Sequence, residues 1–380
     1  MKRREFIRSS GAQASAWVLA PALLAKAASS DEGIPDNDAS AAPRRIKIGQ
    51  IGICHEHANR ISTLRKFTDD YEVVGVVDDR DSKAARYGGT NLKPFEGLPW
   101  MSEEELFQVP GLEAVLIETA NGDLVPTALR CMERGLAIAM DKPGGEEFAP
   151  FQKLLDGCES RGLPFQIGYM FRGNPAFQFC QEAVKKGWLG EVFEIQADMS
   201  HDYGNERYQH YLSAYAGGVM YNLGCHHIDI IVSLLGSPRD VVSFLGTTTG
   251  AVDGVKNNCL AVLEYPHARA MIHVCDEEPG GLAKRRFKIS GDKGRIEFSP
   301  LERFDGAPLA LQLHLKEGND SYEAGTHLVE FEITEGRYDA QLREFARLVR
   351  KETESRYTPA HDALVQKVHL AASGYTRWSG

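Results

Sequence analysis

Short apolar runs and helical patterns alternate through the first half of the chain. Runs typical of β-strands occupy residues 45–52, 71–77, 114–119 and 136–140, and helical patterns at 58–67 and 124–134 lie between them. Strands that alternate with helices predict an α/β domain with a doubly wound parallel sheet, in which ligand-binding groups follow the carboxyl ends of the strands. We place this first domain at residues 45–164.

The pattern changes after Gly162, where strand-like runs follow one another with few helices between them. They predict a second, α+β domain over residues 165–380 with a large, mostly antiparallel open sheet. Its two C-terminal helices are expected within reach of the first domain. The predicted strands lie at 165–172, 190–199, 241–248, 258–265, 269–275, 286–290, 295–299, 309–316 and 327–333, and the predicted helices at 174–186, 338–352 and 360–377.

A polar stripe interrupts an otherwise apolar segment at residues 217–236. Asn222, His226 and Asp229 are spaced i, i+4 and i+7, which on a helix places them along one side and turns His227 elsewhere. Buried polar groups need hydrogen-bond partners or a substrate. The stripe therefore predicts a functional face, and the alternative is a polar pocket inside the core.

The turn after the first strand resembles a nucleotide-binding loop only in part. A dinucleotide site uses Gly-x-Gly-x-x-Gly, whereas this chain has Gly52-x-Cys54-x-x-His57. Asp78 ends the second strand, where an acid accepts hydrogen bonds from a ribose 2′-hydroxyl and favours NAD over NADP. His55 and His57 are candidates for donating to phosphate or for binding a metal. The alternatives are a turn acid at Asp78 and a solvated helix start at the two histidines.

Composition narrows the class of partner. The 380 residues carry a net charge of -10, with 25% charged and 43% hydrophobic residues. An acidic surface argues against nucleic acid and against anionic membranes, which both require a basic face, and so favours a small-molecule partner. The seven cysteines contain no CxxC pair and are odd in number, so we expect no disulfide framework.

The N-terminus is typical of an export signal. Arg3 and Arg4 precede a mildly apolar stretch, and a small-x-small cleavage candidate lies at 25–27. We expect a twin-arginine signal at 1–27, a flexible linker at 28–44, a periplasmic location and no stable membrane span. The alternative is a basic tail with an apolar anchor.

Several motifs, taken in order, resemble the Gfo/Idh/MocA family, named after glucose-fructose oxidoreductase and inositol dehydrogenase. The resemblance runs from about Ile46 to the C-terminus. The motifs lie at 46–57, 119–121, 141–143, 168–175, 217–229 and 286–298.

The resemblance implies a Rossmann domain, a C-terminal sheet domain, and NAD, less readily NADP, bound between them. It implies oxidation of a sugar, polyol or glycoside hydroxyl, with a cofactor that stays bound through the cycle, and a homodimer or homotetramer formed through the C-terminal sheet. Lys142 and His226 occupy the catalytic positions, and Asn222 stands where the family has aspartate. The other residues placed at the cofactor are Gly52, Cys54, His55, His57, Asp78, Asn121, Asp141 and Arg172.

Substrate contacts and the competing hypotheses involve the stretch before the polar helix. Tyr203, Arg207 and Tyr208, together with His227, are the expected sugar contacts, because tyrosine and arginine suit sugar faces and hydroxyls. One alternative is a metal-dependent, non-redox sugar lyase or hydrolase. Another is a sugar- or nucleotide-binding protein without catalysis. The metal ligands in the first alternative would come from His57, His201, Asp202, His226 and His227.

Overall fold

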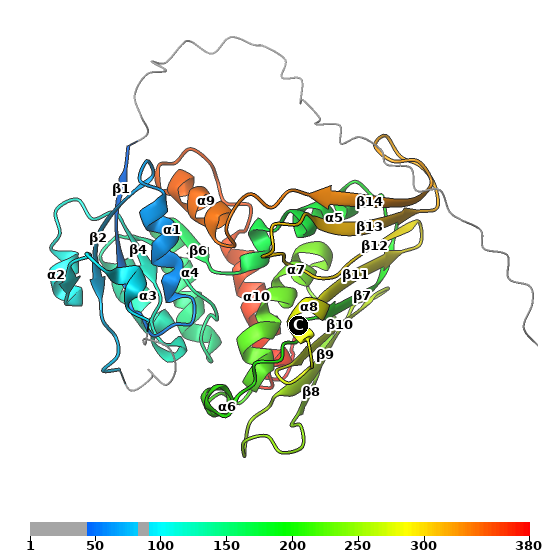
Figure 1. Ribbon diagram of the computed structural model, residues 1–380, viewed down its shortest axis with the longest axis horizontal. Coiled ribbons are helices and arrows are strands. Elements are labelled where there is room, and N and C mark those ends of the chain that lie inside the picture. Colours follow the sequence, from blue (N-terminus) through cyan, green and yellow to red (C-terminus); the bar gives the residue numbers. More distant parts are fainter. Residues whose placement is uncertain (1–43, 83–90) are drawn as a thin grey trace, which may run out of the picture. The chain divides into compact units, whose positions relative to one another are not determined.

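A computed structural model describes residues 44–82 and 91–380 of the chain (Figure 1). The expected signal at 1–27 and nearly all of the expected linker lie outside the described residues. Within the described ranges, no helix combines the length and apolar character needed to cross a membrane.

The first sheet is parallel throughout and has six strands in the order β3-β2-β1-β4-β5-β6. The order reverses between β1 and β4, which are neighbours at the centre of the sheet. Such a switch point opens a crevice at the carboxyl ends of the strands. The strands are β1 (Ile46–Ile51), β2 (Tyr71–Val77), β3 (Trp100–Met101), β4 (Ala114–Ile117), β5 (Ala137–Met140) and β6 (Phe165–Ile167).

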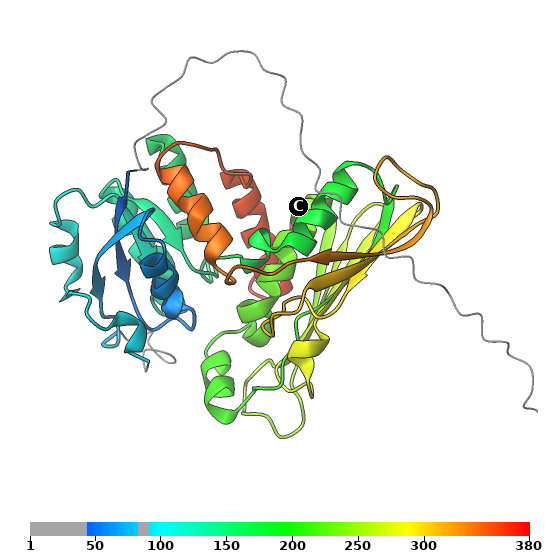
Figure 2. The ribbon, with the colours of Figure 1, turned by 45° about the horizontal axis from the view of Figure 1, so that its top comes forward.

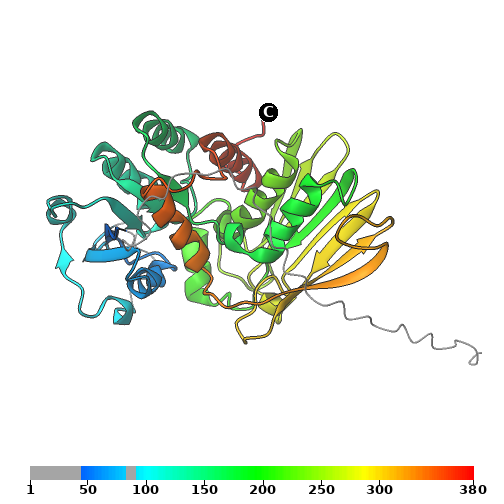
Figure 3. The same ribbon diagram turned by 90° about the horizontal axis from the view of Figure 1, so that it is seen from above.

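Helices cover both faces of this sheet. On one face, Leu342 and Phe345 of α9 (Asp339–Val349) pack with Leu64 of α1 (Ile61–Lys66) against β1. On the other, α3 (Leu124–Glu133) and α4 (Phe148–Arg161) bury their apolar sides. Helix α9 comes from the end of the chain, so a C-terminal helix packs on the first sheet (Figure 3).

The second sheet has eight strands in the order β14-β13-β12-β11-β7-β10-β9-β8. Only β7 and β10 pair in parallel, so the expected mostly antiparallel sheet is confirmed. The strands are β7 (Val192–Asp198), β8 (Asp240–Gly246), β9 (Asn258–Glu264), β10 (Arg269–Cys275), β11 (Arg286–Gly291), β12 (Gly294–Phe298), β13 (Leu309–Leu315) and β14 (Gly325–Phe331).

Two helices, α5 (Pro175–Lys185) and α7 (Cys225–Leu235), lie on one face of this sheet, and none of the described helices covers the other face (Figures 1 and 2). Helix α10 (Pro359–Ala372) contacts both α7 and α4 and so joins the two halves. The predicted strand 165–172 ends early. Its first residues form β6 of the first sheet, so the first sheet extends past the boundary that we placed at residue 164.

The polar segment 217–236 is helical, but its first turns are wider than predicted. A π-helix, η5 (Met220–Gly224), leads directly into α7. Single π turns are rare and are frequently found at functional sites. The remaining short elements are η1 (Ala58–Arg60), η2 (Lys93–Phe95), α2 (Glu103–Phe107), η3 (Asn121–Asp123), η4 (Met170–Gly173), α6 (Glu206–Ser213) and α8 (Gly281–Lys284).

Candidate active site

The loop after β1 turns at Gly52 and lies directly against the end of β4. Gly52 has a φ of +94°, and a Cβ atom there would lie 2.4 Å from the backbone nitrogen of Thr119. Only glycine meets both conditions, because it tolerates a positive φ and carries no Cβ. The bare backbone of this turn therefore sits at the switch point of the sheet, where open α/β sheets bind their ligands.

The acid that faces this loop is Asp79. Its Oδ1 accepts hydrogen bonds from the backbone N–H groups of Ile53 (2.8 Å) and Cys54 (3.0 Å), and its Oδ2 accepts one from Ala120 (3.0 Å). Asp79 thus ties the ends of β1, β2 and β4 together in the crevice. Cys54 is buried, and this burial, with Asp79 beside it, raises the pKa of its thiol.

Asp78, which we placed at the ribose, points elsewhere. Both of its carboxylate oxygens accept hydrogen bonds from the guanidinium of Arg80, which holds the pKa of Asp78 below its ordinary value. Strand alternation gives the reason, since neighbouring residues at a strand end point to opposite sides. The structure thus turns Asp79, and not Asp78, toward the loop, and the acid at the ribose stays a prediction.

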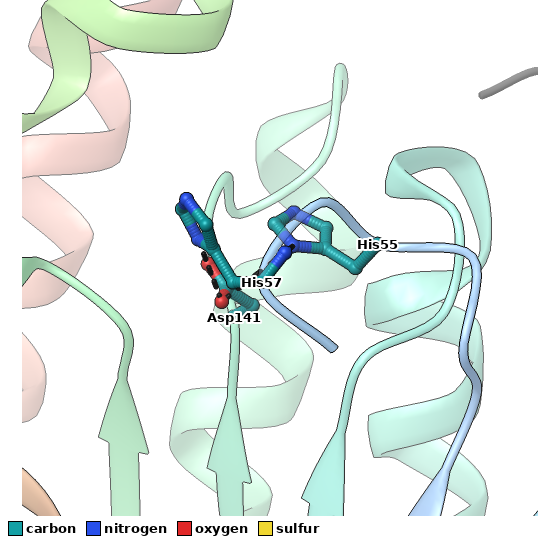
Figure 4. Close-up of side chains that lie close together, drawn as sticks. All are labelled: His55, His57 and Asp141. Carbon is teal, nitrogen blue, oxygen red and sulfur yellow. Dashed lines mark hydrogen bonds and ion pairs between the residues drawn. The ribbon is translucent and has the colours of Figure 1, made fainter. Parts of the chain in front are cut away.

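A buried charged network lies beneath the loop. Arg60 donates hydrogen bonds to Glu118 Oε1 (3.1 Å) at the end of β4 and to Asp141 Oδ2 (3.3 Å) at the end of β5. His57 Nδ1 is 3.0 Å from the same Asp141 oxygen, and His55 Nε2 donates to the backbone carbonyl of Lys142 at 3.0 Å (Figure 4). Sequence patterns singled out the histidines and Asp141 but missed Glu118, which lies near the end of a predicted strand, and Arg60, which lies in the predicted helix after the first strand.

The two carboxyl groups of this network have pKa values that are shifted in opposite directions. Burial by itself raises the pKa of the Asp141 carboxyl, but His55, His57 and Arg60 together outweigh burial and hold that pKa well below its ordinary value. Burial, followed by the neighbouring Asp141, raises the pKa of Glu118 well above its ordinary value. Burial also lowers the pKa of His55 to about 3, so its ring is neutral near pH 7.

Lys142 follows Asp141 and reaches across to the second domain. Its Nζ donates hydrogen bonds to the backbone oxygen of Asn222 (2.8 Å) and to Asn222 Oδ1 (3.3 Å). Asn222 Nδ2 in turn donates to the hydroxyl of Tyr208 at 2.8 Å. The structure therefore brings together the predicted lysine, the asparagine at the acid position and one predicted substrate residue.

His226 lies in the same environment and has a free ring nitrogen. It is 1% exposed, and its Nδ1 has no hydrogen-bond partner. Burial lowers the pKa of His226 well below its ordinary value, and the nearby positive charge of Lys142 lowers it further. The rings of Tyr169 and Phe171 pack beside it. A neutral imidazole with an unused nitrogen next to an ammonium group suits a proton acceptor.

Several tyrosines lie on α6 and on the loop before it, close to the end of β4. Tyr203 is 46% exposed and stacks on the ring of His201 with 3.5 Å between ring centroids. Asn121 Nδ2 donates to the hydroxyl of Tyr211 at 2.6 Å, a contact that sequence patterns did not predict. Arg207 is exposed on the same helix and lines an open depression of about 440 Å³ with Tyr211.

Arg172 lies away from the cofactor loop, contrary to our expectation. Its guanidinium forms a bidentate pair with Asp229, donates to Asp362 at 2.5 Å and lies 3.9 Å from the ring centre of Tyr357. His361 also contacts Asp229 at 2.9 Å. Arg172 therefore joins α7 to α10, and its charge is used inside the protein.

His227 also belongs to the core rather than to the substrate side. Its Nε2 donates to the Asp198 carbonyl (3.2 Å), and its ring stacks against Phe287. Asp202 accepts from the Gly280 backbone N–H at 3.0 Å. Among the described residues, the groups of ligand atoms close enough to share a metal ion do not include the predicted set of His201, Asp202, His226 and His227.

The regions of the chain that match known protein families correspond to the two sheets. Residues 46–169 match the oxidoreductase family with an NAD-binding Rossmann fold, GFO_IDH_MocA, and residues 177–297 match the GFO/IDH/MocA C-terminal domain. The chain belongs to the Gfo/Idh/MocA family. The N-terminal Rossmann-type sheet and the C-terminal sheet expected from the sequence are both confirmed.

Individual members of the Gfo/Idh/MocA family are distant from this chain. It is 24% identical to the rhizopine catabolism protein MocA of Rhizobium meliloti over 224 residues, which are 56% of this chain and 65% of MocA. It is 22% identical to scyllo-inositol 2-dehydrogenase (NADP(+)) IolW of Bacillus subtilis (strain 168) over 288 residues, which are 73% of this chain and 75% of IolW. The chain spans about two thirds or less of the first three curated relatives that it matches.

Among solved structures, GenD2 from gentamicin A biosynthesis in complex with NAD has a TM-score of 0.69 and 17% identity. The similarity covers 89% of this chain and 95% of GenD2. At that identity the likeness concerns the fold.

The residues of this family member fit a dinucleotide in the crevice. Gly52 lets the turn lie against the backbone of β4 at the switch point, and the Asp79 carboxylate holds the loop in place through the backbone N–H groups of the loop and of Ala120. The second and third glycine positions of the usual loop are filled by Cys54 and His57. Cys54 is buried, which turns its side chain away from the crevice, while His57 retains 17% exposure of its side chain.

Proposed function

We propose that this chain is an NAD-dependent oxidoreductase that acts on a hydroxyl group of a sugar, polyol or glycoside. The observation that carries the proposal is the contact between Lys142 at the end of β5 and Asn222 at the start of the polar helix, beside the buried His226. Two domains thereby supply a cation and a base to one place, which oxidation of an alcohol requires.

Each residue has a defined part in this mechanism. His226 takes the hydroxyl proton, because its ring is neutral and its Nδ1 is unpartnered. Lys142 orients the oxygen and stabilises the negative charge that develops on it. Asn222 and Tyr208 hold the Lys142 ammonium in position. A bound nicotinamide would accept the hydride from the carbinol carbon.

The dinucleotide would be held by the backbone at Gly52 and by Asp79, with Asn121 and Lys142 at its nicotinamide end. A carboxylate at the end of β2 accepts from ribose hydroxyls and disfavours a 2′-phosphate, which supports NAD over NADP. The relative IolW carries NADP(+) in its name, so cofactor choice varies among the relatives.

The proposal includes location and assembly. We propose export by the twin-arginine pathway, on the basis of Arg3 and Arg4, with a cofactor that stays bound through the cycle. We also propose a homodimer or homotetramer through the uncovered face of the eight-stranded sheet. Exposed apolar side chains support this assembly, at Phe193, Val242 and Phe244.

The test compares Lys142→Met and His226→Ala with the control Lys186→Met, which changes an exposed lysine. We expect the first two to lower kcat/KM for sugar or polyol oxidation by roughly 10²- to 10⁴-fold and the control to leave it unchanged. Nucleotide released from the denatured wild-type protein is identified by mass spectrometry. Full activity in either site variant, or a wild-type protein that neither carries nor binds NAD(P), contradicts the proposal.

A further inference from the structure

Two histidines of the loop after β1 and the buried Asp141 bring three potential ligand atoms together. His55 Nδ1 lies 3.6 Å from Asp141 Oδ2, and His57 Nδ1 lies 3.0 Å from the same oxygen. The three ligand atoms all lie within 4.8 Å of one another. Figure 4 shows the two histidine rings of the loop on either side of Asp141, which ends its strand.

The tautomer of His55 leaves Nδ1 without a proton. Its Nε2 carries the proton, because Nε2 lies 3.0 Å from the carbonyl oxygen of Lys142, which can only accept. Nδ1 therefore presents its lone pair toward two carboxylates, 3.6 Å from Asp141 and 3.5 Å from Glu118 Oε2. Within residues 44–82 and 91–380, Nδ1 accepts one hydrogen bond, from the His57 backbone N–H at 3.2 Å, at the long end of the hydrogen-bond range.

A histidine whose second ring nitrogen donates to a backbone carbonyl is typical of metal ligands. Metal-bound histidines generally donate their other ring N–H to a backbone carbonyl or carboxylate, which fixes the ring and its tautomer. His55 already makes that contact with Lys142. A first-row divalent metal at bond lengths of about 2.0–2.1 Å in a tetrahedral site has ligand atoms roughly 3.3 Å apart, and the distances from the Asp141 oxygen to the two histidine nitrogens, 3.0 and 3.6 Å, lie on either side of this value.

A carboxylate oxygen beside the three ligands lacks a hydrogen-bond partner. Glu118 is 0% exposed, and its Oε2 has no hydrogen-bond partner. Leaving a buried carboxylate oxygen unpaired is unfavourable. Arg60 contacts both Glu118 and Asp141, but its hydrogen bond to Glu118 goes to Oε1, which leaves Oε2 without a partner.

We propose that His55, His57 and Asp141 bind one divalent first-row transition-metal ion, with Zn²⁺ as the natural choice for two imidazoles and a carboxylate. Three protein ligands leave a fourth position for water. Glu118 Oε2 is placed to accept a hydrogen bond from that water, which provides the partner that this oxygen lacks. The ion links the loop after β1 to the end of β5 and, through His55, fixes the peptide that follows Lys142. The side chains of Lys142 and His226, to which the proposed oxidation belongs, are not among its ligands.

The test measures Zn²⁺ directly on the full-length protein. Protein stripped with a chelator is titrated with Zn²⁺ by calorimetry, and the bound metal is counted by elemental analysis and native mass spectrometry. We expect one equivalent per chain, and His57→Ala to weaken the affinity by roughly 100-fold or more. The matched control is His273→Ala, which changes a histidine in a separate potential ligand group, Asp198, His273 and Glu278, and should leave the affinity unchanged.

A second measurement needs no variant. Co²⁺ bound to the stripped wild-type protein should give the intense visible absorption of a four-coordinate site, and Zn²⁺ should abolish it. Absence of stoichiometric binding overturns the proposal. So does binding that survives His57→Ala or disappears in His273→Ala. Metal content is measured with and without added NAD, and sugar oxidation is assayed separately. A protein that binds the metal but does not oxidise sugars refutes the proposed function and leaves the metal site in place.

Discussion

At the scale of single residues, the contact between Lys142 and Asn222 determines whether the positive charge of Lys142 is compensated in the candidate site. An aspartate at position 222 would form an ion pair with Lys142, whereas the amide leaves the ammonium charge uncompensated by this side chain. That charge contributes to the low pKa of His226, after burial. The asparagine therefore keeps the imidazole neutral over a wide pH range and at the same time makes it a weaker base.

The substitution Asn222→Asp tests this account. The new carboxylate partly cancels the Lys142 charge, so we expect the pKa of His226 to rise and the acid limb of the pH dependence of kcat/KM to move to higher pH. Tyr208 can donate its hydroxyl proton to the carboxylate, which preserves the local contact. NMR titration of the His226 ring provides the direct measurement. The control Asn121→Asp leaves the Lys142 contacts intact, and an unmoved acid limb in Asn222→Asp contradicts the account.

Asp78 and Arg172 differ in position from the sequence-based expectation, and each difference has a simple physical cause. Asp78 and Asp79 are adjacent acids at a strand end, and a single-residue shift exchanges their directions. Arg172 lies in the motif at 168–175, yet its charge is matched by Asp229 and by Asp362, the latter 190 residues further along the chain. No local pattern contains a partner so distant in sequence.

At the scale of elements, the loop after β1 depends on its single glycine. Gly52 combines a positive φ with contact to the backbone of β4, so the turn and the strand end form one unit. This unit positions both histidines of the proposed metal site and the backbone that would meet the dinucleotide.

Gly52→Ala should therefore disrupt both stability and cofactor binding. The strain of a positive φ alone amounts to about 1–3 kcal/mol, and the contact with Thr119 adds to it. Gly97→Ala is the matched control, because Gly97 has a φ of +78° but no atom within 4 Å of its Cβ position. We expect chemical unfolding to show a larger loss for Gly52→Ala than for Gly97→Ala, and nucleotide titration to show weaker binding in the former alone. Equal losses in the two variants would mean that close packing at Gly52 has no effect.

The π turn at Met220–Gly224 is the other decisive element. A regular helix through Asn222, His226 and Asp229 predicts one continuous polar face, and the structure divides that face between two tasks. Asn222 meets Lys142, while Asp229 pairs with Arg172. Helical periodicity found the polar side correctly but carries no information about where the helix widens.

At the scale of the whole molecule, buried neutral histidines make stability depend on pH. Burial lowers the pKa to about 3 in His55 and His201 and to about 4 in His227 and His369, and it lowers the pKa of His226 as well. The unfolded chain takes up protons on these rings near pH 6.5, while the folded chain does not. Stability should be fully present above about pH 6.5 and fall as the pH drops toward the folded pKa values.

His369→Gln isolates one of these contributions. His369 Nε2 donates to the carbonyl of Tyr221 at 2.9 Å, and a glutamine amide can make the same contact. Below about pH 6.5 each such histidine contributes up to about 1.4 kcal/mol per pH unit to the fall in unfolding free energy, so the variant should show a smaller slope by that amount. Urea unfolding at several pH values measures it. His210→Gln, at an exposed site, should keep the wild-type slope, and an unchanged slope in His369→Gln would refute the assignment.

The sequence by itself determined the two sheets, most of their strands, and the identity of the lysine, asparagine and histidine at the candidate site. These follow from alternation, helical periodicity and ordered motifs, all of which are properties of neighbouring residues. Only the tertiary structure decided that Asp79 faces the loop, that Arg172 is used within the core, that α9 returns to the first sheet, and that Glu118 and Arg60 join the histidine cluster. Those facts depend on contacts between residues far apart in the chain, and the direction of a side chain at a strand end or a widened helical turn is fixed by what packs against it.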